Sequence, residues 1–463
     1  MTERIRCVSP VDGRVYAERI APSEAHIAAS LASARAAQRE WRRVSVPERA
    51  RFCLAAIDAM LAMRDEIPEE LAWQMGRPVR YGAGELRGFE ERARYMISIA
   101  EEALAPIDPG PKEGFRRWIA RDPLGVVLVV APWNYPYLTA VNSVVPALMA
   151  GNAVVLKHAA QTLLVGERFQ RAFDTADLPS GLFQNLMLTH AQTAAIISAR
   201  GVDQVNFTGS VAGGKAMETA ASGGFLGVGL ELGGKDPGYV RADVDLALAV
   251  ETLVDGAFFN SGQSCCGIER IYVDRTIYRE FVDSFVETTK AYLLGDPLRA
   301  ETTLGPLVKA EAATFVRGQI AEAVRAGATA LIDPKSFEAD SVGSPYMAPQ
   351  VVVEVTHEMS LMREESFGPV VGIMPVEDDE EAVRLMNDSP YGLTAAIFTR
   401  DVEAAARLGQ EIEAGTVFMN RCDYLDPALA WTGVKDTGRG VTLSRLGYET
   451  LTRPKSFHLR TKS

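Results

Sequence analysis

The sequence predicts an α/β protein with at least two domains and mostly parallel sheets. From residue 124 onward, short apolar segments alternate with amphipathic segments of helical length, which is the pattern of strands joined by covering helices. The chain is also 463 residues long, which is more than one hydrophobic core usually organises. We therefore expect parallel strands with helices on both faces of the sheet.

The first hundred residues are expected to be helical. Ser23 is a plausible N-cap for the segment after it, and Ser45 with Glu48 forms the Ser-x-x-Glu pattern of a capping box. A Pro- and Gly-rich stretch at residues 105–114 interrupts these helices. Beyond it, the first alternating set has strands at 124–131, 152–159, 183–188 and 202–209 and helices at 137–151, 163–176 and 211–221.

A second alternating set follows, with strands at 268–274 and 370–376 and helices at 278–294, 308–327 and 377–388. The acidic run at residues 377–381 is best interpreted as the solvated start of the last helix, because acidic side chains are favoured at a helix N-terminus. The tail at residues 457–463 is typical of a strand in need of a partner, which another subunit could supply.

The composition argues against several classes of protein. The net charge is −12 and the isoelectric point about 5.2, whereas a nucleic-acid binder normally has a basic patch or stripe. The most continuous apolar run, residues 125–133, is too short to span a bilayer, and the N-terminus lacks the apolar segment of a secretory signal. We therefore expect a cytoplasmic protein without nucleic-acid or membrane partners.

The five cysteines are odd in number and scattered, so they do not form a disulfide framework, and no Cys-x-x-Cys or His-x-x-x-His pattern indicates a metal site. Cys265 and Cys266 are adjacent, in the segment GQSCC. Either both pack inertly, or one is a nucleophile held on a turn. The stretch up to Cys265 is too polar and Gly-rich for a simple core thiol, whereas Cys7 and Cys53 are expected to be inert.

Three further segments have residues suited to catalysis or to a nucleotide. Asn134, in PWNYP, follows a buried strand and lies where ligands bind to open α/β sheets, unless it only closes its own turn. Gly209 and Ser210 begin a helix after a strand, which suits a phosphate, although glycine-led helices are common. Glu231 follows an apolar strand, and desolvation would raise its pKa toward that of a usable base, unless it caps a neighbouring amide.

Together these segments resemble the NAD(P)-dependent aldehyde dehydrogenase superfamily. The matching stretches occur in the family's order over essentially the whole chain: PWNYP, GNAVVLKHA, FTGS, ELGGKDP, GQSC, EESFGP, YGLTAAIF and GTVFMN. The resemblance implies an atypical Rossmann cofactor domain, an α/β catalytic domain and a small oligomerisation flap, assembled as a homodimer or homotetramer. It assigns 1–103 and 124–233 to the cofactor-binding domain, 234–430 to the catalytic domain, and 104–123 and 431–463 to the oligomerisation and anchor segments.

The same resemblance implies catalytic roles. Cys265 would be the nucleophile, Glu231 the general base and Asn134 an oxyanion donor, while Cys266 falls at a variable position. The implied reaction oxidises a small aldehyde to a carboxylic acid through a thiohemiacetal and a thioester on the cysteine. The implied cofactor-binding residues are Trp133, Lys157, Gly209, Ser210, Gly214, Leu232, Glu365 and Phe367.

The chain departs from the family at positions that affect the cofactor and proton transfer. Ala160 stands where NAD-preferring members often have a glutamate that holds both ribose hydroxyls, so NAD or NADP is expected, and His158 replaces a frequent proline. Ser143 and Thr442 stand where a lysine and a glutamate are common beside the general base. We therefore expect the general base to work through water.

The resemblance does not identify the aldehyde. Arg421 could pair with the distal carboxylate of a semialdehyde, or bond only to Asp423 or backbone carbonyls. Asn142 stands where some succinate-semialdehyde enzymes have an arginine. We expect uncharged, partly aromatic or aliphatic aldehydes, either over a broad range or of medium size, in a tunnel lined by Tyr135, Thr139, Asn142, Arg421, Asp423, Tyr424, Leu425 and Trp431.

Two rival functions are weighed against this one. A CoA-acylating dehydrogenase would pass the acyl group to CoA, but Glu231 argues against it because such members generally do not need that base. A non-catalytic structural or cofactor-binding descendant would have lost Cys265, Asn134 or Glu231, and all three are present.

Overall fold

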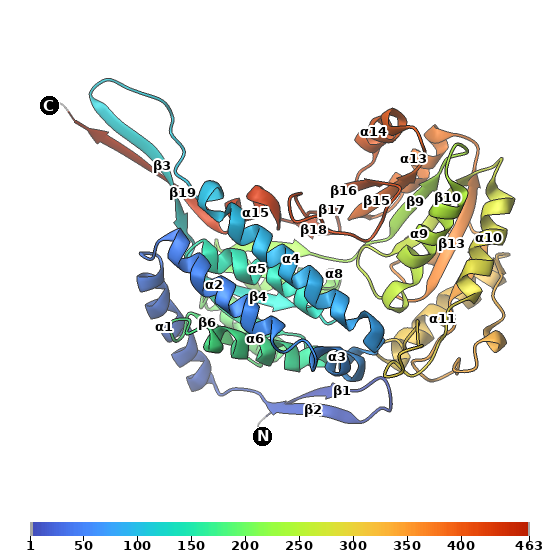
Figure 1. Cartoon of the computed structure of the whole chain (residues 1–463), viewed down its shortest axis with the longest axis horizontal. Helices are drawn as coiled ribbons and strands as arrows, with labels where there is room; N and C mark the ends of the chain where they lie inside the picture. The colour runs from blue at the N-terminus through green and yellow to red at the C-terminus, as the bar shows by residue number, and fades with distance from the viewer. Residues whose placement is uncertain (1–2, 462–463) are drawn as a thin grey trace.

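The computed structural model describes residues 3–461 and has two α/β lobes side by side, with a two-stranded arm that projects from one of them (Figure 1). The first lobe is built on a six-stranded sheet in the order β18-β8-β7-β4-β5-β6. Its strands are parallel except β18, which is antiparallel to β8. They are β4 (Val126–Ala131), β5 (Ala153–His158), β6 (Phe183–Asn185), β7 (Gln204–Thr208), β8 (Gly227–Glu231) and β18 (Gly438–Arg439).

Helices bury the centre of this sheet on both faces. Every residue of β4 and β5 is buried, which accounts for their nearly continuous Val and Leu composition. Helices α1, α5 and α6 pack directly on the sheet, and α2 and α4 form an outer layer on α5 and α6. The helices are α1 (Glu24–Trp41), α2 (Val46–Leu61), α3 (Ile67–Met75), α4 (Val79–Ala103), α5 (Pro136–Met149), α6 (Leu163–Thr175), α7 (His190–Ser198), α8 (Val211–Ala221) and α15 (Ser444–Glu449).

The second lobe contains a seven-stranded sheet in the order β11-β12-β13-β10-β9-β15-β16, parallel except for β11. Its strands are β9 (Asp236–Val240), β10 (Ile268–Asp274), β11 (Thr329–Ala330), β12 (Gln350–Val353), β13 (Val370–Val376), β15 (Thr394–Phe398) and β16 (Thr416–Met419). Its helices are α9 (Leu246–Phe258), α10 (Tyr278–Lys290), α11 (Ala310–Arg325), α12 (Ser360–Arg363), α13 (Asp379–Asn387) and α14 (Val402–Glu411).

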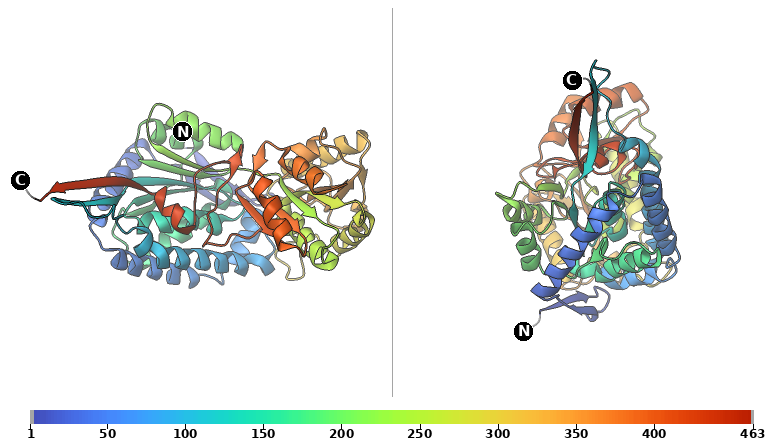
Figure 2. Two further views of the ribbon diagram at one scale, coloured as in Figure 1. Left: turned by 90° about the horizontal axis from the view of Figure 1, so that it is seen from above. Right: turned by 90° about the vertical axis from the view of Figure 1, so that its left-hand side faces the viewer.

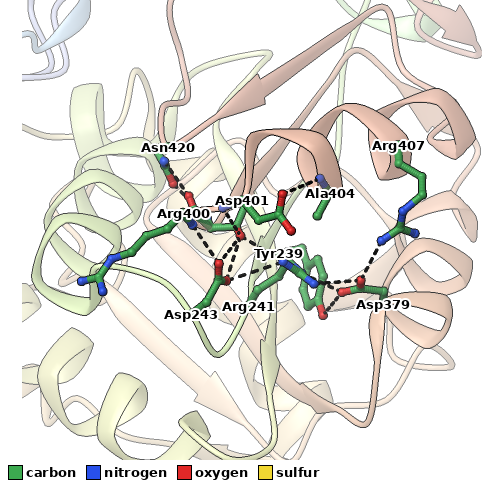
Figure 3. A network of polar contacts seen from close by, with 10 residues as sticks. Tyr239, Arg241, Asp243, Asp379, Arg400, Asp401, Ala404, Arg407 and Asn420 are labelled. Atoms are coloured by element: carbon green, nitrogen blue, oxygen red, sulfur yellow. Dashed lines mark hydrogen bonds and ion pairs between the residues drawn. The ribbon is translucent and has the colours of Figure 1, made fainter.

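A polar network closes the carboxyl end of this second sheet (Figure 3). Asp379, in the first turn of α13, accepts hydrogen bonds from the Tyr239 hydroxyl at 2.8 Å and from Arg241 Nε at 2.9 Å. Asp243 accepts from the hydroxyl of Thr399 and the backbone N–H of Arg400. The acidic start of α13 is therefore as predicted, and an aspartate at position 378 caps the helix. The hydrogen bonds to Asp379 also link the segment after β13 to the end of β9. Acidic side chains dominate the neighbouring hollow, and this disfavours an anionic nucleotide there.

Residues 457–460 of the strand predicted at the C-terminus belong to a strand that begins earlier, ends at residue 460 and has its partner in the same chain. β19 (Thr452–Arg460) pairs antiparallel with β3 (Phe115–Pro123) along its whole length, and the two extend away from the body of the molecule (Figure 2). Trp118 stacks on Phe457 across this arm, with ring centroids 4.3 Å apart. The last two residues of the predicted strand, 462 and 463, lie outside the described residues.

The N-terminal prediction is correct for the helices and wrong for the first twenty residues. β1 (Arg4–Val8) and β2 (Val15–Ile20) form an antiparallel hairpin, because polar and apolar residues alternate in β1 and both segments contain the Val, Ile or Tyr residues that favour strands. Ser23 and Ser45 cap α1 and α2 as predicted. The capping box at Ser45 is only half formed, because the Glu48 carboxylate pairs with Arg51.

Candidate active site

Two cavities meet at the carboxyl end of the first sheet, where the segment before β10 from the second lobe approaches it. The first, of 270 Å³, extends toward the start of α8, and the second, of 70 Å³, lies beside α4 and α5. Four residues line both cavities: Thr208, Glu231, Leu232 and Cys265. A thiol and a carboxylate at this junction have access to two different ligands.

The segment that carries Cys265 is held by unusual backbone conformations. Asn260 and Ser261 have φ values of 55° and 58°, and Gly262 continues with φ 71°. Gly262 cannot be replaced by a larger residue, because a Cβ there would collide with the carbonyl of Gly368. Positive φ in consecutive non-glycine residues is uncommon and is typical of functional turns. The turn leaves the side chain of Cys265 half-buried.

The neighbouring Cys266 differs from Cys265 in its surroundings. Its thiol is buried and donates a hydrogen bond to Oδ1 of Asp423 at 2.8 Å. The hydrogen bond with Cys265, burial and the Asp423 charge together raise the pKa of Cys266 well above its ordinary value. Burial likewise raises the pKa of Cys7 and of Cys53 to about 12, as expected for inert thiols.

Glu231 ends β8, and two threonine hydroxyls hold its carboxylate. Oε1 accepts from Thr442 at 2.6 Å and Oε2 from Thr208 at 3.0 Å. Burial raises the pKa of Glu231, whereas these two hydrogen bonds and the charge of Arg92 lower it. The result is a carboxylate with a raised pKa, held on two sides by neutral donors.

A further small cavity, lined by both polar and apolar residues, lies next to Glu231. Ser143, Gln204, Asn206 and Thr442 are among the residues that line it. Asn206 Nδ2 donates to the Ser143 hydroxyl at 3.1 Å and its Oδ1 accepts from Gln204. The hydroxyl side chains expected from the family departures therefore line a hydrogen-bonded compartment next to the carboxylate.

Asn134 is buried, and its amide does not close its own turn. Nδ2 donates to the carbonyl of Gln263 at 3.2 Å, in the segment that carries Cys265. The backbone carbonyl of Asn134 accepts from Arg77 Nη2 at 2.5 Å, and Arg77 also donates to Asn260 Oδ1. The amide nitrogen of Asn134 has two N–H groups, so one is left for a ligand in the cavity that it lines with Cys265.

Arg77 and Glu85 position this region, and the sequence analysis did not identify either residue. The two form a buried ion pair, and Glu85 Oε1 accepts from the backbone N–H groups of Tyr137 and Leu138 at the start of α5. The carboxylate therefore caps the helix that follows Asn134. Glu85 falls on the buried face of α4 with Leu86 and Phe89, which is the signal that could have revealed it, whereas Arg77 lies in the loop before α4 and has no such signal.

The larger cavity contains most of the predicted cofactor residues. Trp133, Gly209, Ser210, Leu232, Glu365 and Phe367 line it. Trp133 and Phe367 meet edge to face at 5.7 Å, and burial raises the pKa of Glu365 to about 7. Ser210 caps α8 by accepting from Gly213 N, and Gly214 lies against Leu232 without lining the cavity.

Lys157 lies apart from this cavity, at the end of β5. Its side chain is buried, burial lowers its pKa, and no residue among 3–461 forms a hydrogen bond or ion pair with its ammonium group. The nearby His158 is neutral, because burial lowers its pKa to about 4. Next to the exposed Ala160, an unpaired ammonium group fits the hydroxyls or phosphate of a nucleotide ribose.

The smaller cavity contains most of the predicted tunnel residues, and Arg92 in addition. Tyr135, Thr139, Asn142, Asp423, Leu425 and Trp431 line it with Arg92 and Cys266. Arg421 does not: its side chain is exposed and its guanidinium lies 3.5 Å from the centre of the Tyr424 ring. Tyr424 is also outside the lining and donates to Glu91. Arg92 was missed, although its spacing from the buried Phe89 and Met96 places it on the buried face of α4.

Over residues 3–461, no helix is long and apolar enough to cross a membrane. The same part of the chain has no group of three or more His, Cys, Asp or Glu residues placed to hold a metal ion.

Comparisons with known proteins agree with this arrangement. A sequence model of the aldehyde dehydrogenase family matches residues 1–457. A succinate-semialdehyde dehydrogenase [NADP(+)] of Mycobacterium avium is 33% identical over 98% of this chain and 96% of its own length. A crystal structure of an NAD-dependent aldehyde dehydrogenase from Sinorhizobium meliloti superposes with a TM-score of 0.94 at 29% identity, covering 100% of this chain and 92% of that one.

A third relative has its cofactor bound. It is an NADP-dependent glyceraldehyde-3-phosphate dehydrogenase from Bacillus halodurans in complex with NADP, with a TM-score of 0.93, 30% identity, and coverage of 99% of this chain and 96% of that one. The fold is therefore that of the aldehyde dehydrogenases. The chain belongs to the aldehyde dehydrogenase family, and it is an enzyme that oxidises aldehydes with NAD or NADP.

Proposed function

We propose that Cys265 is the nucleophile of this aldehyde oxidation, Glu231 its general base and Asn134 its oxyanion donor. The observation that supports this assignment best is the position of Cys265 and Glu231 at the junction of the two cavities. A thiol there can reach an aldehyde from one side while a nicotinamide occupies the other. The buried Cys266, whose pKa is raised, is suited to packing instead.

In the first half of the reaction, the thiolate of Cys265 adds to the aldehyde carbon and gives a thiohemiacetal. Its oxyanion is stabilised by the side-chain amide of Asn134 and the backbone N–H of Cys265. The nicotinamide, when bound, accepts the hydride that leaves this carbon. A thioester on Cys265 is then left for hydrolysis.

In the second half, Glu231 removes a proton from the water that attacks the thioester. A carboxylate with a raised pKa suits this role near neutral pH. The addition of water breaks the carbon–sulfur bond, releases the carboxylic acid and returns the thiol. We propose that the proton leaves through the compartment lined by Ser143, Asn206 and Thr442, in place of a lysine and a glutamate.

The cofactor residues are proposed as Trp133, Lys157, Gly209, Ser210, Gly214, Leu232, Glu365 and Phe367. Lys157 supports use of NADP as well as NAD, because its unpaired ammonium group can bind either a ribose hydroxyl or a 2′-phosphate. Ala160 supports the same conclusion, since it contributes no negative charge to repel the phosphate.

We propose that 1–103 and 124–233 form the cofactor domain, 234–430 the catalytic domain, and 104–123 with 431–463 the oligomerisation and anchor segments. The projecting β3–β19 arm supports a homodimer or homotetramer, because its strands have few contacts with their own body (Figure 2). The reducing cytoplasm is the proposed compartment, as five free cysteines suggest.

The test of the proposed reaction is NAD(P)H formation from a panel of aldehydes, with and without CoA. The proposal predicts turnover with the free acid as product and no requirement for CoA. A strict requirement for CoA would favour the acylating reaction, and no NAD(P)H from any aldehyde in the parent would contradict the function itself.

A further inference from the structure

The smaller cavity contains a buried cation that Glu85, Glu231 and Asp423 influence through their charge without forming an ion pair with it. The Arg92 side chain is 8% exposed, and its Nη1 donates to the carbonyl of Leu138 at 2.9 Å and to Asn142 Oδ1 at 3.4 Å. Nothing else among residues 3–461 bonds to it, and no carboxylate forms an ion pair with it. Burying a charge without a partner is costly, so such a group usually binds a ligand or a counter-ion.

Asn142 adds a second unpaired donor to the same cavity. Its side chain is 2% exposed, and its Nδ2 has no hydrogen-bond partner. A guanidinium only donates, so the amide oxygen must face Arg92, and the amide nitrogen is then the atom left without an acceptor. Two adjacent donors, one of them charged, therefore lack acceptors in one wall of the cavity.

The two acidic side chains of the cavity are already engaged elsewhere. Glu231 accepts from the hydroxyls of Thr442 and Thr208. Asp423 accepts from the hydroxyl of Ser264 at 3.1 Å, from Cys266 and from Tyr135. Burial raises the pKa of both carboxyl groups, and the charge of Arg92 lowers it without direct contact between the groups. The remaining N–H groups of this wall are therefore open to an acceptor from a ligand.

We propose that Arg92 and Asn142 bind the carboxylate at the far end of the aldehyde substrate, so that this enzyme prefers a semialdehyde acid to an uncharged aldehyde. The proposal rests on the aldehyde oxidation at Cys265 proposed above. It differs from the uncharged substrate expected from the sequence, and it moves the anchoring guanidinium from Arg421 on the surface to Arg92 in the cavity.

A carboxylate fits this wall better than a phosphate. It offers two oxygens in one plane, which a guanidinium can bind in a bidentate way. A phosphate carries a greater negative charge, and Arg92 is the one basic residue that lines the cavity, opposite two acidic ones. The cavity of 70 Å³ also favours a short substrate.

The test compares kcat/KM for succinate semialdehyde and for pentanal in the parent, in Arg92→Met and in Arg421→Ala. The parent should prefer succinate semialdehyde, and Arg92→Met should lower that preference by about 10- to 100-fold, mainly through KM, which is the range for a hydrogen bond to a charged group. Arg421→Ala is the matched control, and it should keep the preference of the parent.

Two further measurements test the proposal independently of Arg92→Met. If Arg92→Met does not fold, Asn142→Leu, which has a similar volume, should still lower the preference. Glyceraldehyde 3-phosphate, tested beside these substrates, should be oxidised less efficiently than succinate semialdehyde. The carboxylate anchor would be overturned if the parent preferred pentanal or glyceraldehyde 3-phosphate, or if the cavity variants kept the preference of the parent. Oxidation of pentanal by the parent would still support the proposed function, so the two failures can be told apart.

Discussion

The hydroxyl of Thr442 donates a 2.6 Å hydrogen bond to Oε1 of Glu231. The bond stabilises the charged form of the carboxylate and so lowers its pKa, against the rise that burial causes. A neutral hydroxyl therefore adjusts the pKa of the proposed general base at the position where many relatives of this chain are expected to have a glutamate.

Thr442→Val should remove this bond and raise the pKa of Glu231. Because only the deprotonated carboxylate acts as a base, the acid limb of the deacylation pH profile should move to higher pH. We expect a loss of about fivefold on the acid limb of the profile, which corresponds to a hydrogen bond of about 1 kcal/mol. Thr442→Ser keeps the hydroxyl and should restore the profile, and an unshifted profile in Thr442→Val would show that the bond does not act on the base.

Cys265→Ser should abolish dehydrogenase activity while the folded state and cofactor binding persist, because a serine hydroxyl at this position lacks the thiolate nucleophile. Cys266→Ala should keep most of the activity, since its thiol is buried against Asp423. Steady-state NAD(P)H formation and cofactor binding measure both effects. An inactive Cys266→Ala beside an active Cys265→Ser would reverse the assignment.

Both NAD and NADP should support turnover, with efficiencies within about two orders of magnitude of each other, because electrostatic discrimination is limited at a partly exposed site. Ala160→Glu should shift the ratio of kcat/KM values toward NAD by at least about tenfold, because the added carboxylate would repel a 2′-phosphate. The control is Ala160→Gln, which has the same size without the charge. Equal shifts in both variants would mean that volume, and not charge, selects the cofactor.

Arg77→Met should destabilise the protein by about 3–5 kcal/mol, because it leaves the carboxylate of Glu85 buried without its cation. The exposed Arg80, three residues away, offers a control, since Arg80→Met removes a 3.3 Å hydrogen bond to a backbone carbonyl and a cation–π contact with Tyr81 but breaks no buried ion pair. Thermal or urea unfolding measures the loss of stability in both variants. Equal midpoints for the two variants would show that the buried ion pair contributes little to stability.

The sequence was sufficient for much of the fold and less so for the polar interior. The continuous apolar runs of β4 and β5 and the caps at Ser23 and Ser45 depend on local pattern, so they were predictable. The pairing of β19 with β3 was not, because it joins segments more than 300 residues apart whose order along the chain gives no register. Such contacts depend on the tertiary arrangement.

The residues of the candidate site also divide into those that the sequence reveals and those that only the structure reveals. The sequence reveals Cys265, Glu231 and Asn134, because each lies in or beside a segment rich in glycine or proline that is recognisable without the structure. Arg92 lies in the middle of a long helix rich in charged residues. Its spacing from Phe89 and Met96 indicates a buried position, and the packing of α4 on α5 shows it. The lack of an ion-pair partner is a property of the folded chain, so the sequence alone could not reveal it.

The most direct test of the central claim is the time course of NAD(P)H formation in Glu231→Gln. If Cys265 forms a thioester that Glu231 helps water to hydrolyse, this variant should give a rapid burst of about one NAD(P)H per active site. A phase slower than the parent's turnover by about 10²-fold or more should follow, which is the range for a lost general base. Absence of the burst would show that Glu231 acts before hydride transfer, and an unchanged steady-state rate would show that another group activates the water.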